Sequence, residues 1–393
     1  MDCILIGDRI ADRRMGTTTL EGVGVRSMKK NKEWLTMIGR WPFKPKNGNV
    51  FYRTLGTLCW MASLCFCSGD LFSQEQKVIV VVGAGGSDDY QQQFETWADN
   101  WKSAITAAGE SGPDFVCIGL EDRPTEQNDL LRLKQELANP GEGIAELWVV
   151  LIGHGTDDGK VSKFNLRGPD LSAVQLHDWL INQKARTIVV NCASSSGGFV
   201  GKLKHPNRVV ITATKSSAQR NFARFGEYLS SAIDDPAYDL DKDLQTSLLE
   251  AVVAASSQTQ EFYLQETRLA TELAMIDDNG DGKGTPSDWF EGTRAVKKSK
   301  ANEPDGFVSN QVFLIRRGTE AKLTIEQRET REQLERELES LRQKKDALGE
   351  VNYYQSIEPV LLKLAKLYQS VGSEESVDGQ DSSLSETPVS PEK

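Results

Sequence analysis

Residues 146–155 read Glu-Leu-Trp-Val-Val-Leu-Ile-Gly-His-Gly, and residues 187–192 read Thr-Ile-Val-Val-Asn-Cys. Each stretch is an almost unbroken apolar run, as expected for a strand buried on both faces of a parallel sheet. The first run leads directly into His154 and the second into Cys192, two residues suited to acyl transfer. Parallel strands end at one edge of a sheet, so these side chains should lie close together if the strands are neighbours.

Strand-like and helix-like segments alternate between residues 77 and 233. The other predicted strands are Lys77–Val82, Asp114–Gly119 and Arg208–Thr212. The amphipathic segments between strands are Tyr90–Ala108, Thr125–Ala138, Leu171–Gln183 and Ala218–Ile233. This alternation predicts an α/β domain with an open, mostly parallel sheet and helices on both faces. A late strand is expected at Asn310–Arg316, followed by helices over 324–345 and 351–369, the second interrupted by Pro359.

The paired His and Cys residues indicate nucleophilic catalysis. A free thiol has a pKa of about 8.5 and is mostly protonated at neutral pH. An adjacent imidazole can accept the thiol proton and later pass it to the leaving amine. We therefore predict Cys192 as the nucleophile and His154 as its acid/base partner. The backbone amides of Gly155 and Cys192 are predicted to form the oxyanion hole.

These motifs resemble the legumain-like and caspase-like cysteine peptidases (clan CD), and most closely the legumain (asparaginyl endopeptidase) branch. The resemblance rests on the strand–His-Gly and strand–Cys motifs, on the loop at 82–87 and on the segment 210–217. It implies a caspase–hemoglobinase-like fold, a thioacyl-enzyme and a protein or peptide substrate. It further implies substrate-binding roles for Ser87, Thr212 and Thr214, and makes Ser87 or Asp88 a candidate to orient His154.

The resemblance leaves the substrate preference open. Gln91-Gln92-Gln93 stands where legumain has the basic residues of its specificity pocket. Hydrolysis and transpeptidation both remain compatible with the motifs.

Two acidic segments have the oxygen-ligand spacing of EF-hand calcium loops. Their predicted calcium ligands are Asp239, Asp241, Asp243 and Glu250 in the first loop, and Asp277, Asn279, Asp281 and Asp288 in the second. Hard oxygen ligands at positions 1, 3, 5 and 12 suit a hard cation. Gly282 occupies the sharp-turn position of the second loop, whereas Leu244 stands there in the first. We expect structural calcium; the alternative is a pair of solvated acidic turns.

The chain divides into four predicted regions. Residues 1–76 form a leader in which basic residues precede an apolar core at 55–66, the order of a secretory signal. The expected location is therefore periplasmic or secreted, with an uncleaved membrane anchor as the alternative. Residues 77–318 form the peptidase domain, including the calcium-loop insert 239–291. Residues 319–370 form a charged helical segment for self-association or for autoinhibition, and 371–393 an acidic disordered tail.

The sequence disfavours two other function classes. The net charge of −11 argues against a nucleic-acid partner. The Gly83-Ala84-Gly85-Gly86 run hints at a dinucleotide site, but Asp88 takes the place of the third glycine, so no organic cofactor is expected. The remaining alternative is a catalytically inactive, secreted calcium-binding scaffold or interaction protein on the same fold.

Overall fold

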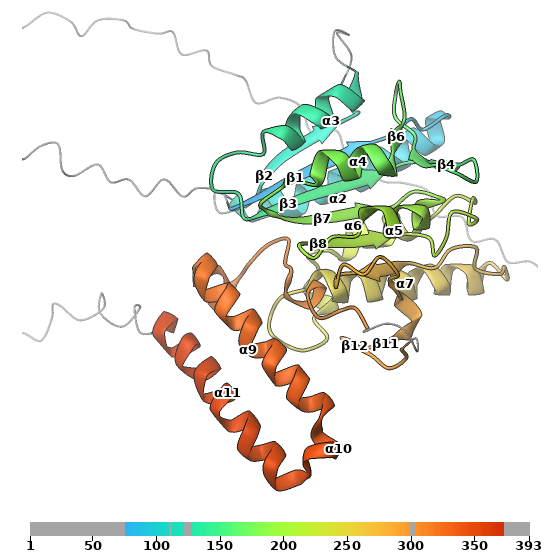
Figure 1. Ribbon diagram of the computed structural model, residues 1–393. Helices are drawn as coiled ribbons and strands as arrows, with labels where there is room; N and C mark the ends of the chain where they lie inside the picture. Colours follow the sequence, from blue (N-terminus) through green and yellow to red (C-terminus); the bar gives the residue numbers. More distant parts are fainter. Residues whose placement is uncertain (1–74, 110–111, 122–127, 299–303, 373–393) are drawn as a thin grey trace, which may run out of the picture. The chain divides into compact units, whose positions relative to one another are not determined.

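A seven-stranded sheet forms the centre of the molecule (Figure 1). The computed structural model describes residues 75–109, 112–121, 128–298 and 304–372. The strands follow the spatial order β10-β9-β8-β7-β3-β1-β2. Their bounds are β1 Gln76–Val82, β2 Asp114–Ile118, β3 Glu146–Ile152, β7 Arg186–Asn191, β8 Arg208–Thr212, β9 Met275–Asp277 and β10 Thr285–Pro286. The five strands from β8 to β2 are parallel, whereas β9 and β10 are antiparallel to their neighbours.

Helices cover both faces of the sheet. One face carries α2 (Asp88–Ala107), α6 (Phe225–Ala232) and α7 (Leu248–Gln265), and the other carries α3 (Asp129–Ala138), α4 (Ala173–Leu180) and α5 (Val200–Leu203). Alternate residues of β3 face the two cores: Trp148 packs with the α2 side and Val149 with the α3 side. Each fully buried side chain of this size contributes roughly 1.5–3 kcal/mol. The predicted fold class is therefore confirmed.

Polar residues at the helix starts explain where several helices begin. Ser172 and Gln175 form a capping box at α4, in which each side chain bonds the other residue's backbone amide. The same arrangement opens α7 with Ser247 and Glu250. Such boxes satisfy amide groups that would otherwise lack partners in the first helical turn.

The late strand predicted at Asn310–Arg316 is wrong. A 3-10 turn spans Ser309–Gln311, and the chain then runs without regular structure. Val312 and Phe313 are buried, and their carbonyls accept hydrogen bonds from the Leu248 amide and the Gln76 side chain. The segment is apolar because it packs under α7 and the start of β1, without a ladder of strand hydrogen bonds.

Smaller strands occupy two loops. β4 (Gly155–Asp157), β5 (Ser162–Phe164) and β6 (Leu171–Ser172) form a three-stranded sheet directly after β3. β11 (Phe290–Glu291) and β12 (Arg294–Ala295) form a hairpin. The 239–291 insert contains α7 in its first half and β9, β10 and β11 in its second half.

The C-terminal region is helical, as predicted. It contains α8 (Gly318–Lys322), α9 (Ile325–Gln343), α10 (Lys345–Leu348) and α11 (Glu350–Gly372). Leu334 and Leu338 of α9 pack against Val360 of α11, and the two helices lie side by side (Figure 1). The predicted interruption at Pro359 is wrong, because α11 continues through it. Val360, the next residue, packs against α9, and this contact offsets the cost of the helix hydrogen bond that Pro359 cannot donate.

Ion pairs attach α9 to the amino-terminal edge of the sheet. Arg186, the first residue of β7, donates to both carboxylate oxygens of Glu332 at 2.6 and 2.7 Å. Arg316 bonds Glu146, the first residue of β3, at 2.7 Å, and Arg328 pairs with Glu75. The C-terminal helices are therefore anchored where the parallel strands begin.

The predicted leader, up to residue 74, and the predicted tail, from residue 373, lie outside the described residues, so signal, anchor and disorder stay predictions. Within the described ranges, no helix combines the length and apolarity that crossing a membrane requires.

Candidate active site

The two strands that carry His154 and Cys192 are neighbours, as the site prediction requires. β3 and β7 pair in parallel, with Leu151 opposite Asn191. The Cys192 amide bonds the Leu151 carbonyl, which continues the ladder by one residue and places Cys192 level with Ile152. Both motifs therefore stand at the carboxyl edge of the sheet, but Cys192 lies two residues deeper than His154.

The structure places Cys192 inside the apolar core. Its amide donates to the Leu151 carbonyl at 2.9 Å, so the residue continues the ladder of β7. Its side chain is 1% exposed, belongs to the core under α2 and α6, and makes no hydrogen bond to His154. Burial, with a smaller contribution from Glu272, raises the pKa of the thiol to about 12. Burial and the raised pKa both make the thiol unreactive in this conformation, and its nucleophilic role stays a prediction.

His154 stands at the rim, held by one hydrogen bond and a group of aromatic rings. Its Nε2 atom lies 3.1 Å from the carbonyl oxygen of Gly85. The rings of Tyr90, Phe94 and Phe222 surround the imidazole at centroid distances of 4.9, 5.1 and 5.9 Å. A carbonyl oxygen can only accept, so Nε2 carries a proton and Nδ1 of the neutral ring is left as a base.

The orienting group is thus the Gly85 carbonyl, and neither Ser87 nor Asp88. Ser87 is the exposed N-cap of α2, where its hydroxyl accepts from the Tyr90 amide at 3.5 Å. Asp88 follows in the first helical turn. Both serve the start of α2.

Ser194 is the hydroxyl that contacts the His-Gly motif. Its Oγ accepts from the Gly155 amide at 3.2 Å and donates to the Gly155 carbonyl at 3.0 Å. Gly155 is required here, because a Cβ on it would meet the Ser194 carbonyl oxygen at 2.2 Å. The sequence prediction did not include Ser194; the available signal was its hydroxyl in the turn two residues after Cys192.

Both amides of the predicted oxyanion hole already donate hydrogen bonds to other groups in this conformation. The Cys192 amide belongs to the strand ladder, and the Gly155 amide bonds Ser194. Turning the Ser194 side chain outward would free the Gly155 amide for a substrate oxygen.

Thr212 and Thr214, predicted to bind substrate, are fully buried. The Thr212 hydroxyl donates to the Thr214 carbonyl at 2.9 Å. The Thr214 hydroxyl accepts from the Gly197 amide at 2.9 Å and lies 3.1 Å from the Ser196 hydroxyl. In this structure the two threonines position the turn that carries Ser194.

The first predicted calcium loop brings its three aspartates together. Carboxylate oxygens of Asp239, Asp241 and Asp243 all lie within 4.8 Å of one another. Both oxygens of Asp239 accept backbone amides, among them those of Lys242 and Leu244. Glu250 is likewise occupied: one oxygen accepts the amides at 240 and 241, and the other accepts the amide and the hydroxyl of Ser247.

The second predicted calcium loop connects β9 to β10. Asp277 accepts from the Gly280 amide at 3.1 Å, Asn279 from the Asp281 amide at 2.9 Å, and Asp281 from the Lys283 amide at 2.8 Å. The position-12 residue, Asp288, is exposed in a separate 3-10 turn.

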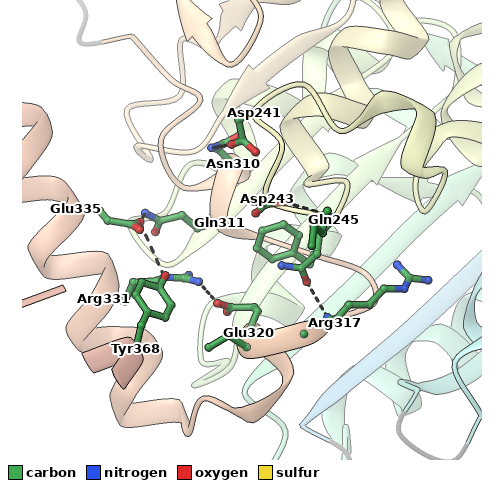
Figure 2. A pocket seen from close by; sticks show the side chains of 14 residues that line it. Asp241, Asp243, Gln245, Asn310, Gln311, Arg317, Glu320, Arg331, Glu335 and Tyr368 are labelled. Carbon is green, nitrogen blue, oxygen red and sulfur yellow. Dashed lines mark hydrogen bonds and ion pairs between the residues drawn. The ribbon is translucent and has the colours of Figure 1, made fainter. Parts of the chain in front are cut away.

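A cavity of about 740 Å³ lies between the first acidic loop and the C-terminal helices (Figure 2). Arg331 of α9 pairs there with Glu320, and Tyr368 of α11 also lines the wall. This cavity and the α9 ion pairs belong to the side of the molecule where strands begin. In this structure α9 is thus held at the edge opposite His154, and both autoinhibition and self-association through residues 319–370 stay predictions.

Comparisons with known proteins do not assign this chain to a family. No protein-family model and no curated protein matches the chain. Among solved structures it is similar to the crystal structure of the Drosophila initiator caspase Dronc, with 11% identity and a TM-score of 0.33 over 54% of this chain and 82% of that chain. A similarity this weak carries no argument about activity. The fold therefore rests on the observed sheet, and the resemblance to the legumain branch stays a prediction.

Proposed function

We propose that this protein is a peptidase-type hydrolase whose base is His154 and whose nucleophile is the Ser194 hydroxyl. The observation that supports it is the pair of contacts at the rim: the Gly85 carbonyl leaves Nδ1 of His154 basic, and Ser194 bonds the adjacent Gly155. The Cys192 thiol, the nucleophile expected from the sequence, lies in the core instead.

The proposed reaction is an acyl transfer. After the Ser194 side chain turns outward, its Oγ attacks the substrate carbonyl carbon while its proton passes to Nδ1 of His154. The amides of Gly155 and Ser194 hold the oxyanion. The C–N bond breaks as His154 gives that proton to the leaving amine. Water then cleaves the seryl ester, with His154 taking a proton from water and returning one to Oγ.

Labelling of the full chain tests the proposal. The protein is treated with a fluorophosphonate, which reacts with activated serines, and with acyloxymethyl-ketone peptides of varied P1 residue, which react with thiols. We expect a fluorophosphonate adduct on Ser194 that is lost in His154→Ala and kept in Cys192→Ala. Turnover of fluorogenic peptides should follow the same pattern.

The Ser194→Cys variant sharpens the test. It places a thiol beside Gly155, so once this side chain turns outward, acyloxymethyl ketones should label position 194 and leave Cys192 unlabelled. Labelling of Cys192 in the unmodified chain would instead restore the thiol mechanism expected from the sequence.

A second candidate, a binding protein without catalysis, is favoured by one observation. The Ser194 side chain is 5% exposed and already donates to the Gly155 carbonyl. Absence of adducts and turnover in both the unmodified chain and Ser194→Cys would overturn the hydrolase proposal and favour this candidate.

A further inference from the structure

The loop between β9 and β10 contains a buried carboxylate oxygen without a partner. Asp277 is 1% exposed, and its Oδ2 atom makes no hydrogen bond among the described residues. Its other oxygen accepts the Gly280 amide at 3.1 Å, which turns the carboxylate into the loop. Burying a charged oxygen without compensation is strongly unfavourable, so such an atom points to a missing positive partner.

The neighbouring carboxylates, unlike that of Asp277, have hydrogen-bond partners. Asp278 accepts from the Gly306 amide and from the amide and hydroxyl of Ser309, at 2.8–3.1 Å. Asp305 accepts from the Asp278 amide at 2.9 Å and the Thr285 hydroxyl at 2.7 Å. The carboxylates of Asp278 and Asp305 therefore both have hydrogen-bond partners. Among these three aspartates, only Asp277, at position 1 of the loop, has a buried oxygen without a partner.

Three glycines give the loop between β9 and β10 a tight, left-handed backbone at alternate positions. Gly280, Gly282 and Gly284 have φ angles of +76°, +78° and +66°, a region that other residues seldom adopt. Asn279 and Asp281 each hold the amide two residues ahead with one side-chain oxygen.

We propose that this loop binds one calcium ion through the side chains of Asp277, Asn279 and Asp281, with backbone carbonyls and water completing the shell. The donors are all oxygens, on a loop with the 1, 3, 5 spacing that calcium loops use. Magnesium demands stricter octahedral geometry and holds its water more tightly, so calcium is the better fit. Because Asp288 stands in a separate turn, the site lacks the bidentate position-12 ligand, and weak binding is expected.

The first acidic loop provides a matched control. Asp241 and Asp243 are exposed, and both oxygens of the buried Asp239 already accept backbone amides. No side-chain atom of Asp239, Asp241 or Asp243 appears among the buried partnerless groups of the described residues. That cluster therefore contains no comparable partnerless oxygen, and calcium binding there stays a prediction.

Isothermal titration of the EGTA-treated full chain with calcium, together with thermal unfolding, tests the proposal. We expect one site per chain and a rise in Tm with calcium. Asp277→Asn should weaken binding at least tenfold and abolish the rise in Tm, whereas Asp241→Asn should change neither. Magnesium should bind at least tenfold more weakly.

Folding and binding effects are separable in these variants. Asp277→Asn keeps the side-chain size and removes a buried charge, so its Tm without calcium should equal or exceed that of the unmodified chain. Asp281→Asn, on the half-buried part of the loop, should also weaken binding. The proposal is overturned by the absence of binding up to about 5 mM calcium, which exceeds the roughly 0.1–1 mM dissociation constants of extracellular calcium modules, by unchanged binding in Asp277→Asn, or by loss of binding in Asp241→Asn.

Discussion

The carbonyl oxygen of Gly85 lies 3.1 Å from Nε2 of His154. Gly85 belongs to the loop after β1 and His154 to the loop after β3, and these two strands are paired along their whole length. The glycine is required, since a Cβ at position 85 would meet the Gln91 amide nitrogen at 2.7 Å. One backbone contact between adjacent strand ends thus fixes the orientation of the imidazole.

This contact predicts the tautomer of His154. The neutral ring should carry its proton on Nε2, because the Gly85 carbonyl can only accept a hydrogen bond. Long-range ¹H–¹⁵N NMR at pH 8 measures this directly, and the chain has only three histidines. Loss of one spin system in His154→Gln assigns the signal. A proton on Nδ1 would remove the base from the proposed mechanism.

The Cys192 thiol should be almost inert in the folded protein. Each pKa unit above pH lowers the thiolate fraction about tenfold, so a pKa of about 12 predicts alkylation at pH 8 roughly 1000-fold slower than in an unfolded chain. N-ethylmaleimide labelling with and without urea, followed by mass mapping of the Cys192 peptide, gives both rates. Rapid native labelling would show that Cys192 leaves the core.

Removal of the Glu332 carboxylate should loosen the C-terminal helices. Glu332→Gln leaves the mostly buried Arg186 with a weaker partner, and we expect a loss of about 1–3 kcal/mol in unfolding free energy. Glu339→Gln is the control, since Glu339 pairs with Arg342 at the surface at 3.6 Å and should contribute below about 1 kcal/mol. Urea unfolding compares the two; equal losses would contradict the assigned docking.

The sheet edge at Glu146 should make the protein sensitive to acid. Burial by itself would raise the pKa of Glu146, but Arg316, Arg186 and a 2.7 Å hydrogen bond from Gln76 hold it below its ordinary value. A lowered folded-state pKa adds stability above the unfolded-state value of about 4.3, which is lost as pH falls through the folded-state value.

Glu146→Gln therefore should destabilise the protein by about 1–3 kcal/mol at pH 7, and by less at pH 3–4 where the unmodified Glu146 also becomes protonated. Unfolding free energies from pH 3 to 7 test this sign, with Glu337→Gln, on the exposed face of α9, as the control. A difference that grows toward low pH would contradict the assigned ion pairs.

Gly226 of α6 should not tolerate a methyl group. A Cβ there would lie 2.7 Å from the Cβ of Cys192 and 2.9 Å from the Trp97 ring. Overpacking should outweigh the gain in helix propensity and destabilise Gly226→Ala by about 1–3 kcal/mol. Gly201→Ala, with its nearest contact at 3.4 Å, should be neutral or stabilising. Thermal unfolding distinguishes them, and equal Tm values would mean that the core around Cys192 is loosely packed.

The sequence was sufficient for the sheet and for the edge that carries the site. Runs such as 146–152 and 187–191 are apolar throughout because their residues face both cores, and this pattern is visible without coordinates. The glycine-rich spacing of the second acidic loop was visible for the same reason, since it depends on local backbone geometry.

Other features depended on contacts between distant segments. Sequence placed Cys192 at the strand end, but only the pairing of Leu151 with Asn191 shows that the strand ladder continues through it and turns its thiol into the core. Ser194, the Gly85 carbonyl and the Arg186–Glu332 pair likewise come together only in the folded chain. Local periodicity decides which residues are buried, whereas register and packing decide which polar atoms meet.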